Sequence, residues 1–316
     1  GSTGKPKGVV LSHRGVMNTL RDCNQRYGVT ESDRALQLSD LSFDISVYDI
    51  FGMLSAGGAV VIPDEERHLE PPHWIELVRQ HQVTIWFSVP MYADMWVQSG
   101  EALPSLRLFM LAGDKIPCEL PGRIRALMPS TSVWSLGGAT EASIVSVWYE
   151  IGEVDPIWSS IPYGQAMTNQ EMYVLDAGLN HCPPYMPGRI FIGGIGVALG
   201  YWRDPEKTAA AFITHPETGA RIYNTGDLGR WLPDGQMEFL GRADFQVKVN
   251  GFRVELGEIE GAIQTLPGVT TAIVDALDQP GGNGKFLVAY MIMEGQIEVA
   301  RIRADLQERL PYYMIP

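Results

Sequence analysis

The sequence has only three cysteines, Cys23, Cys118 and Cys182, which lie far apart and form no C-x-x-C pair. This spacing excludes a disulfide framework and a cysteine zinc site, and it favours buried thiols in a reducing compartment. None of the six histidines forms an H-x-x-x-H pair, which argues against a zinc hydrolase. The sequence also lacks an apolar run of about 18 residues and a secretory leader, so we expect a cytoplasmic protein that makes no membrane contact.

Basic residues are scarce relative to acidic ones. The 316 residues include 24 lysines and arginines against 37 aspartates and glutamates, for a net charge of −13. This balance disfavours extensive contact with nucleic acid, whose phosphates attract basic surfaces. It does not exclude ATP, because a few local lysines and a magnesium ion are enough to bind one nucleotide.

The first half of the chain alternates short apolar runs with an amphipathic helical pattern. Such alternation is typical of an α/β layer fold. The spacing predicts a helix over 73–82 and buried strands over 58–63, 83–90 and 106–113.

The pattern changes near residue 160 and again near residue 241. Short strands separated by turn residues, at 171–176, 188–194 and 236–242, indicate mostly antiparallel sheet. The segment 241–260 is charged and hairpin-like, and strands and a helix follow it at 271–277, 285–293 and 300–310. We therefore expect an α/β core with a β-rich part over 1–243, followed by a small α+β domain over 244–316.

The opening stretch GSTGKPKG combines glycines, hydroxyls and lysines within eight residues. Glycines let backbone N–H groups approach an anion closely, and hydroxyls and lysines add donors and charge. On these residues alone, a phosphate loop and a flexible N-terminus are equally good interpretations. The stretch does not match the G-x-x-x-x-G-K-[ST] nucleotide loop.

Asp44 and Asp49 lie in the apolar run FDISVYDIF. The sequence favours Asp44 as the cap of a helix, and the alternative is a carboxylate that pairs with a ligand ammonium group. Further on, the stretch LGGATEASI places Thr140 and Glu141 after two glycines. That pattern suits either a nucleotide phosphate with its magnesium ion or a tight turn with a helix cap.

Asp227 follows a glycine in the strand-like stretch YNTGDLGRW. A carboxylate there suits ribose hydroxyls, and a simple β-turn is the alternative. The glycines of GGIGVALG have the spacing G-x-G-x-x-x-G, which misses the dinucleotide fingerprint by one residue. That stretch predicts a turn before a helix that begins near Asp204.

Taken together, six stretches in order resemble the adenylation domain of nonribosomal peptide synthetases, in the adenylate-forming superfamily. They are GSTGKPKG, FDISVYDIF, LGGATEASI, YNTGDLGRW, GRADFQVKVNGFRVELGEIE and LPYYMIP. The second and third look most similar to the subgroup that activates cysteine and other small amino acids. By the same resemblance, the chain begins inside the first motif and ends before an N-G-K motif, so we expect a fragment truncated at both ends.

The resemblance implies activation of an amino acid by ATP, followed by transfer to the phosphopantetheine thiol of a peptidyl carrier protein. It makes Thr140, Glu141 and Lys248 catalytic, with Glu141 holding Mg²⁺, and Asp244 the hinge. Many family members carry an adenine-stacking aromatic residue where Gly137 stands, so Phe239 is expected to carry more of that contact. The implied ATP site comprises Ser2, Thr3, Gly4, Lys5, Lys7, Gly137, Gly138, Ala139, Thr140, Asp227, Phe239 and Arg242.

The resemblance also implies a substrate pocket made of Asp44, Ile45, Tyr48, Phe87, Met110, Ala112, Leu136, Ile144 and Val145. Since this set offers a charged side chain no partner, we expect an apolar or weakly polar substrate side chain of small to medium size. Expected partners are the carrier protein, neighbouring synthetase modules and a small MbtH-like helper protein. The alternatives are an acyl- or aryl-CoA ligase, which Asp44 argues against, and a non-catalytic fragment that docks carrier or helper protein.

Overall fold

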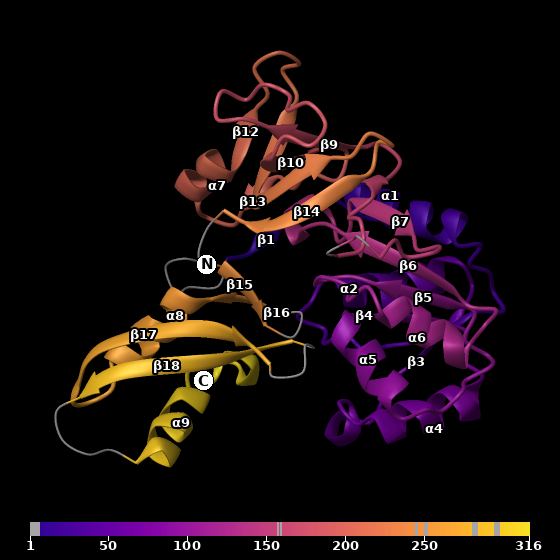
Figure 1. Ribbon diagram of the computed structural model, residues 1–316, viewed down its shortest axis with the longest axis horizontal. Helices are drawn as coiled ribbons and strands as arrows, with labels where there is room; N and C mark the ends of the chain where they lie inside the picture. Colours follow the sequence, from indigo (N-terminus) through magenta and orange to yellow (C-terminus); the bar gives the residue numbers. More distant parts are fainter. Residues whose placement is uncertain are drawn as a thin grey trace. The chain divides into compact units, whose positions relative to one another are not determined.

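The computed structural model describes residues 7–156, 158, 160–243, 246–249, 252–279, 284–293 and 298–316, without the side chains of residues 246 and 253. The chain divides into two compact units, one from Val9 to Ala243 and one that holds the C-terminal part. The first unit contains a seven-stranded and a five-stranded sheet, and the second contains two hairpins (Figure 1).

The seven-stranded sheet has the order β3-β2-β4-β5-β6-β7-β8. Pairing is parallel from β3 to β6 and antiparallel at β7 and β8. The strands are β2 (Arg34–Leu36), β3 (Ala59–Val61), β4 (Ile85–Ser88), β5 (Leu108–Leu111), β6 (Ser132–Gly137), β7 (Val147–Glu150) and β8 (Gln165–Ala166). The three strands predicted in this part of the sequence are confirmed as β3, β4 and β5.

Helices cover both faces of this sheet. On one face pack α4 (Pro71–His81), α5 (Pro90–Gln98) and α6 (Leu120–Leu127). On the other face pack α1 (His13–Arg26) and the short α2 (Ile45–Val47), η1 (Tyr48–Gly52) and α3 (Met53–Ser55). The single turns η2 (Glu65–Arg67) and η3 (Thr140–Ala142) lie in connections between strands. The helix predicted over 73–82 is confirmed as α4. Ser12 caps α1 by accepting a hydrogen bond of 3.0 Å from the amide of Gly15.

Each face of the sheet has its own hydrophobic core, because successive residues of a strand point to opposite faces. Trp86 and Phe109 lie on one face, where their rings pack with Trp96 of α5. Phe87 and Met110 belong to the core of the other face, with residues of α1 and of the segment 45–53. Burial on both faces explains why the strands read as continuous apolar runs.

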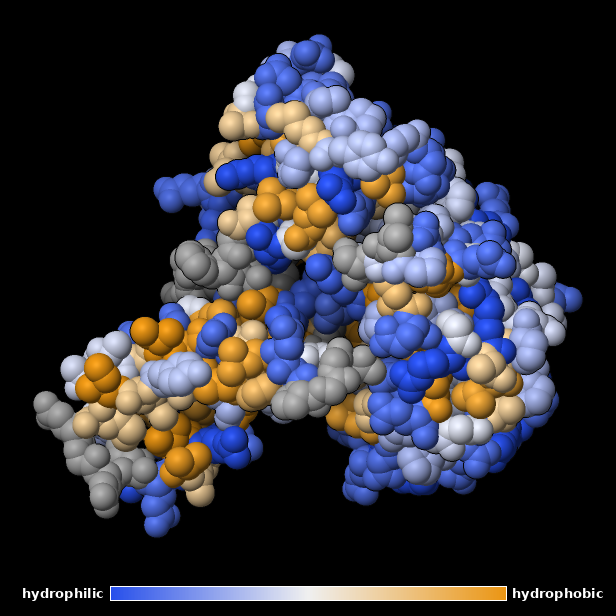
Figure 2. Space-filling model, in the orientation of Figure 1, coloured by the Kyte–Doolittle hydropathy of each residue, from blue (hydrophilic) through white to orange (hydrophobic). Residues whose placement is uncertain are grey.

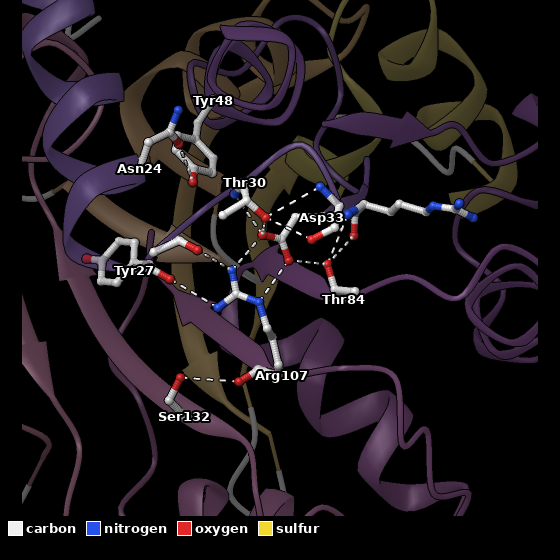
Figure 3. Close-up of polar contacts among 11 residues, drawn as sticks. Asn24, Tyr27, Thr30, Asp33, Tyr48, Thr84, Arg107 and Ser132 are labelled. Atoms are coloured by element: carbon white, nitrogen blue, oxygen red, sulfur yellow. Dashed lines mark hydrogen bonds and ion pairs between the residues drawn. The ribbon is translucent and has the colours of Figure 1, made fainter. Parts of the chain in front are cut away.

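An ion pair joins the amino ends of three neighbouring strands (Figure 3). Arg107 precedes β5 and donates through Nε and Nη2 to the two carboxylate oxygens of Asp33, both at 2.8 Å. The hydroxyl of Thr84, which precedes β4, donates to Asp33 Oδ1 at 2.8 Å. Although burial opposes it, hydrogen bonding from Arg107, Thr30 and Thr84 lowers the pKa of Asp33 to about 2. These contacts hold the amino ends of the three strands together, away from their carboxyl ends.

The second sheet of the first unit is antiparallel, as the sequence predicts. Its order is β12-β13-β10-β9, with β14 paired to β13. Its strands are β9 (Gln170–Leu175), β10 (Gly188–Gly194), β12 (Phe212–Thr214), β13 (Arg221–Trp231) and β14 (Met237–Arg242). A two-stranded pair, β1 (Val9–Val10) with β11 (Gly200–Tyr201), and the helix α7 (Pro205–Ala211) complete the unit. Asp204 caps α7 at the amide of Lys207, so the predicted helix start is confirmed.

The C-terminal unit consists of β15 (Gln246–Val249), β16 (Phe252–Glu255), α8 (Leu256–Gln264), β17 (Val269–Asp278), β18 (Lys285–Met293), α9 (Val299–Gln307) and η4 (Tyr312–Met314). The predicted hairpin, strands and helix are therefore present. Ile259 of α8 and Leu306 of α9 pack in one core with residues of the β17–β18 hairpin. Apolar side chains also lie exposed on that hairpin, where orange atoms gather (Figure 2). Ile273 and its register partner Tyr290 are both exposed.

The structure bears on the predictions about the cysteines and about membrane-spanning helices. All three cysteines are free, but only Cys23 and Cys182 are buried, whereas Cys118 is half-buried. The expectation of buried thiols is thus wrong for Cys118. Across the described part of the chain, no helix has the length and apolar character needed to cross a membrane.

Candidate active site

Several residues of the expected substrate pocket lie on adjacent parallel strands, towards the carboxyl ends at which ligands bind in open α/β sheets. Phe87 of β4 and Met110 of β5 are register partners. Leu136 of β6 lies two residues beyond Trp134, the register partner of Met110, and therefore on the same face. The amide of Ala112 continues this pairing past the end of β5 with a 3.1 Å hydrogen bond to the carbonyl of Ser88.

Apart from Asp44, all the pocket residues that the sequence suggests belong to a single buried cluster. Each side chain in this set is apolar or aromatic and is at most 9% exposed: Ile45, Tyr48, Phe87, Met110, Ala112, Leu136, Ile144 and Val145. The structure thus brings together residues that are spread over 101 positions of the sequence, from 45 to 145. The expected pocket residues other than Asp44 thus form a nearly uniform apolar group.

Tyr48 is positioned by two features of its neighbourhood. It begins η1, a π-helical turn, a form that is frequent at functional sites. A Cβ atom on Gly52 would lie 2.7 Å from the Tyr48 ring, so only glycine leaves that ring its place. The Tyr48 hydroxyl donates to Oδ1 of Asn24 at 3.1 Å (Figure 3), and the Asn24 amide donates to the Gly52 carbonyl at 2.8 Å.

Asp44 precedes α2, but its carboxylate makes no capping hydrogen bond, so the capping interpretation is wrong. The hydroxyl of Thr140 instead donates to Asp44 Oδ2 at 2.6 Å. Burial raises the pKa of Asp44 to about 6, with a further rise from the charge of Glu141, although the Thr140 hydrogen bond acts in the opposite direction. This contact places the expected amine partner beside the expected phosphate loop.

The loop after β6 carries the next set of expected residues, Gly137 to Glu141. Thr140 is exposed, whereas Glu141 is only 1% exposed. The hydroxyl of Tyr201, on β11, donates to Glu141 Oε1 at 2.7 Å. Glu141 is therefore held by a hydrogen bond that motif reading does not reveal.

A strained turn follows this loop and directs Ile144 and Val145 into the pocket cluster. Ile144 has a φ of +78°, which is a rare conformation for a β-branched residue. The amide of Val145 donates to the carbonyl of Ser143 at 3.1 Å, which closes a three-residue γ-turn of the strained positive-φ kind. The carbonyl of Ser143 accepts a hydrogen bond from the hydroxyl of Thr19 at 2.9 Å. The hydroxyl of Ser143 donates to the carbonyl of Gly196 at 2.8 Å. These bonds hold the strained turn in place.

Asp227 and Arg242 are paired across β13 and β14, where they are register partners. The Nη1 atom of Arg242 donates to Asp227 Oδ1 at 2.9 Å and to the carbonyl of Thr225 at 3.0 Å. Asp227 is 8% exposed. Its carboxylate is thus fixed in orientation, as a group that binds vicinal hydroxyls requires.

The AMP-binding enzyme family matches residues 1–202, which is more than half of the chain. The chain belongs to the AMP-binding enzymes. Within them it is an adenylation domain of the nonribosomal peptide synthetase type. It is 47% identical to pyochelin synthetase PchF of Pseudomonas aeruginosa over 303 residues, which are 94% of this chain and 17% of that protein.

Two solved structures give the same relationship. The adenylation domain is similar to the nonribosomal peptide synthetase FmoA3 in its α-methyl-L-serine-AMP bound form, with a TM-score of 0.74 and 49% identity, over 81% of this chain and 29% of that one. It is also similar to the Vibrio cholerae adenylation domain AlmE in complex with glycyl-adenosine-5′-phosphate, with a TM-score of 0.89 and 28% identity, over 100% of this chain and 60% of that one. The chain thus spans only part of each of these relatives.

The donor set of the adenylation domain fits magnesium bound through a nucleotide. No group of three or more His, Cys, Asp or Glu side chains that could enclose a metal occurs among the described residues. The expected ligand is the single carboxylate of Glu141, next to Thr140. Magnesium at nucleotide phosphates takes one or two carboxylates and completes its shell with phosphate and water oxygens. The residues present are consistent with that mode.

Several expected site residues lie outside the first unit or outside the described residues. Ser2, Thr3, Gly4, Lys5 and the hinge residue Asp244 lie outside the described residues. Lys7 is half-buried, and Lys248 lies on β15 of the C-terminal unit. Their roles remain predictions.

Asn24, Tyr201 and Tyr163 were not predicted from the sequence. Asn24 and Tyr201 carry no motif signal, because each acts through a hydrogen bond to a residue far away in sequence. Tyr163 had an indirect signal, since Gly137 stands where the family often has an aromatic ring. In this adenylation domain the ring of Tyr163 lies against Gly137 and packs on Phe239, with ring centroids 5.7 Å apart.

Proposed function

We propose that this adenylation domain activates an amino acid with ATP in two half-reactions. In the first, an oxygen of the amino acid carboxylate bonds to the α-phosphorus, the bond to the β-phosphate oxygen breaks, and pyrophosphate leaves. In the second, the phosphopantetheine thiol of a peptidyl carrier protein gives up its proton and bonds to the acyl carbon, and AMP leaves. Positioning and charge neutralisation suffice for the first step, so no protein nucleophile is needed.

The observation that carries this proposal is the hydrogen bond from Thr140 to Asp44. An α-amino acid has its ammonium group one carbon away from the carboxylate that must reach the phosphate. A carboxylate that binds the amine therefore has to lie close to the residue that binds the α-phosphate, and Asp44 and Thr140 meet this requirement. A ligase for a simple acid has no need of the Asp44 carboxylate.

The remaining residues of the nucleotide site act by binding and orientation. Asp227, held by Arg242, accepts hydrogen bonds from the ribose hydroxyls, and Glu141 holds Mg²⁺, which neutralises phosphate charge when bound. Gly137, Gly138 and Ala139 let the backbone approach the nucleotide closely. Ser2, Thr3, Gly4, Lys5 and Lys7 hold the pyrophosphate. The form of FmoA3 with bound AMPPNP, 46% identical to this chain, supports ATP as the nucleotide.

The apolar cluster supports a small to medium, apolar or weakly polar side chain as the substrate class. A charged side chain would lose its hydration there without gaining a partner, at a cost of several kcal/mol. The hydroxyl of Tyr48 is already bound to Asn24. The ligands of the two solved relatives, α-methyl-L-serine-AMP and glycyl-adenosine-5′-phosphate, are consistent with this class.

Two further roles belong to the C-terminal unit. Asp244 is the hinge about which that unit turns between the half-reactions, as lids do in many enzymes. Lys248, on β15, is the further catalytic residue that the family resemblance implies. The expected partners are the carrier protein, neighbouring modules and a small MbtH-like helper protein. This chain spans only 17% of its relative PchF, so PchF is long enough to contain further modules.

Pyrophosphate exchange in the full-length protein tests the proposal, with each amino acid compared with its desamino analogue. Removal of one partner of a buried ion pair costs about 3–5 kcal/mol, so Asp44→Ala should weaken amino acid activation roughly 10²- to 10⁴-fold and the desamino acid much less. Equal loss for both would mean that Asp44 acts only structurally. Exchange with aryl or fatty acids alone would favour a CoA ligase, and carrier binding without ATP binding would favour a docking fragment.

Phe87→Asn is the companion variant for the substrate class. It returns a hydrogen-bonding group to the pocket wall and should shift the exchange profile towards smaller, more polar amino acids. An unchanged profile would place Phe87 outside the substrate pocket.

A further inference from the structure

The ring of Tyr163 lies directly on the backbone of Gly137, at the end of β6. A Cβ atom built on Gly137 would lie 1.9 Å from Cε2 of this ring, 2.5 Å from Cζ and 2.7 Å from Cδ2. These distances are far below van der Waals contact. Any side chain at position 137 would therefore displace the tyrosine ring. The ring occupies the space that such a side chain would fill.

The backbone on both sides of the ring is fixed. The amide of Tyr163 donates to the carbonyl of Met237 at 2.7 Å, and the amide of Met237 donates to the carbonyl of Gly164 at 2.9 Å. Gly164 has a φ of +107°, and a Cβ atom there would lie 2.1 Å from the carbonyl oxygen of Trp148. The backbone of Tyr163 and Gly164 is thus held closely against β7 and β14.

Tyr163 packs against a second aromatic residue. The ring of Phe239, on β14, lies 5.7 Å from the Tyr163 ring between centroids, at an interplanar angle of 39°. The ammonium group of Lys115, in the loop after β5, lies 5.6 Å from the centroid of the Phe239 ring. Both residues are half-buried.

The phenol group of Tyr163 lies near the two places that the proposed function assigns to a nucleotide. Burial raises the pKa of Tyr163, and the negative charge of Asp227 adds to that rise, while a backbone hydrogen bond at Gly138 opposes it. Gly138 belongs to the phosphate loop, and Asp227 is the proposed ribose ligand. Because the base of a nucleotide is joined to the ribose, an aromatic ring beside the proposed ribose ligand Asp227 lies within reach of that base.

We propose that Tyr163, seated on Gly137 and packed against Phe239, is the aromatic wall on which the adenine ring of ATP stacks in this protein. The inference rests on the proposed function, because it assumes that ATP is the nucleotide. It assigns the stacking residue to the segment before β8, and it makes Gly137 and Tyr163 a matched pair of small and large residues.

Calorimetric titration of the full-length protein with ATP, and separately with inorganic tripolyphosphate, tests the proposal without depending on turnover. Base–aromatic stacking corresponds to a loss of about 5- to 150-fold in affinity when the ring is removed. Tyr163→Leu should therefore weaken ATP binding by that factor and leave tripolyphosphate binding unchanged, because tripolyphosphate has no base. Tyr163→Phe is the matched control and should stay within about threefold of the wild type.

The pairing with Gly137 has its own test. Gly137→Ala should push the ring aside and weaken ATP binding as Tyr163→Leu does. The double variant Gly137→Tyr with Tyr163→Ala, which moves the ring onto the end of β6, should recover most of the ATP affinity.

Three results would overturn the inference. One is unchanged ATP affinity in Tyr163→Leu, and another is equal weakening of ATP and tripolyphosphate, which indicates a structural role. The third is a double variant no better than Gly137→Ala. A wild-type protein that binds no ATP at all would instead contradict the proposed function, so the two failures can be distinguished.

Discussion

Thr140 and Asp44 are joined by a hydrogen bond of 2.6 Å although 96 positions separate them in the sequence. The bond links η3, in the loop after β6, to the residue that precedes α2, and thereby the proposed phosphate side of the site to the proposed amine side. It also opposes the rise in the pKa of Asp44 that burial causes. The protonation of the amine-binding carboxylate thus depends on a residue of the nucleotide loop.

Thr140→Val should shift the pH dependence of amino acid activation. If Asp44 must be ionised to bind an ammonium group, the acid limb of kcat/KM in the wild type should lie near its pKa of about 6. Loss of the Thr140 hydroxyl removes a hydrogen bond that favours the ionised form, so the limb should move to higher pH. Exchange rates from pH 5 to 8 measure this shift. Thr140→Ser keeps the hydroxyl and should keep the wild-type limb, and a limb that stays put in Thr140→Val would contradict the link.

Glu141→Gln should abolish adenylate formation while the fold remains intact. Glutamine keeps an oxygen that accepts the hydrogen bond of Tyr201, but it loses the charge that a magnesium ion needs. Pyrophosphate exchange over a magnesium titration, with thermal unfolding alongside, separates the two effects. Tyr201→Phe is the converse variant, expected to lose about 1–3 kcal/mol of stability and to keep magnesium-dependent exchange. Near wild-type exchange in Glu141→Gln would exclude the metal role.

Asp49 should make the protein less stable as the pH rises. Its side chain is 0% exposed, and neither carboxyl oxygen has a hydrogen-bond partner among the described residues. Burial raises the pKa of Asp49 well above its usual range, so the folded state holds a proton that the unfolded state releases above about pH 4. Stability from this group is therefore complete at low pH and is lost as the pH rises towards the folded-state pKa.

Asp49→Asn cannot ionise and removes this dependence. Urea unfolding at pH 5 and pH 8 should show the wild type losing stability relative to Asp49→Asn, by at most about 1.4 kcal/mol per pH unit. Asp234→Asn, at an exposed turn position, is the matched control and should run parallel to the wild type. Parallel curves for Asp49→Asn as well would show that Asp49 is ionised in the folded protein.

Arg107→Met should destabilise the sheet by about 1–3 kcal/mol at neutral pH, because it removes the ion-pair partner of Asp33, although solvent screens part of this interaction since the Arg107 side chain is 40% exposed. The pKa of Asp33 is lowered to about 2, so its stabilising contribution is complete above pH 4 and is lost as the pH falls towards 2. The gap between the wild type and Arg107→Met should therefore narrow in acid, which unfolding midpoints at pH 7, 5 and 3 would show. The double variant with Asp33→Asn should be more stable than Arg107→Met alone. A gap that is the same at every pH would assign the loss to packing.

The sequence by itself determined the elements that depend on local pattern. The strands β3, β4 and β5, the helix α4 and the cap of α7 by Asp204 follow from apolar periodicity and from turn and capping residues, which act within a few positions. The family resemblance supplied the expected pocket residues, and the structure places Phe87, Met110 and Leu136 of that set in one buried cluster. Spaced motifs were sufficient to indicate the family.

Only the tertiary structure decided which partner each polar or aromatic group takes. The sequence favoured Asp44 as a cap, but its carboxylate makes no capping hydrogen bond and instead accepts one from Thr140, in the loop that follows β6. Likewise, Glu141 meets Tyr201 across 60 positions, and Tyr163 occupies the space that Gly137 leaves open. A hydrogen bond or a ring contact depends on distances of a few ångströms between segments far apart in the chain. Local pattern does not encode those distances, since they are set by how the sheets and helices pack.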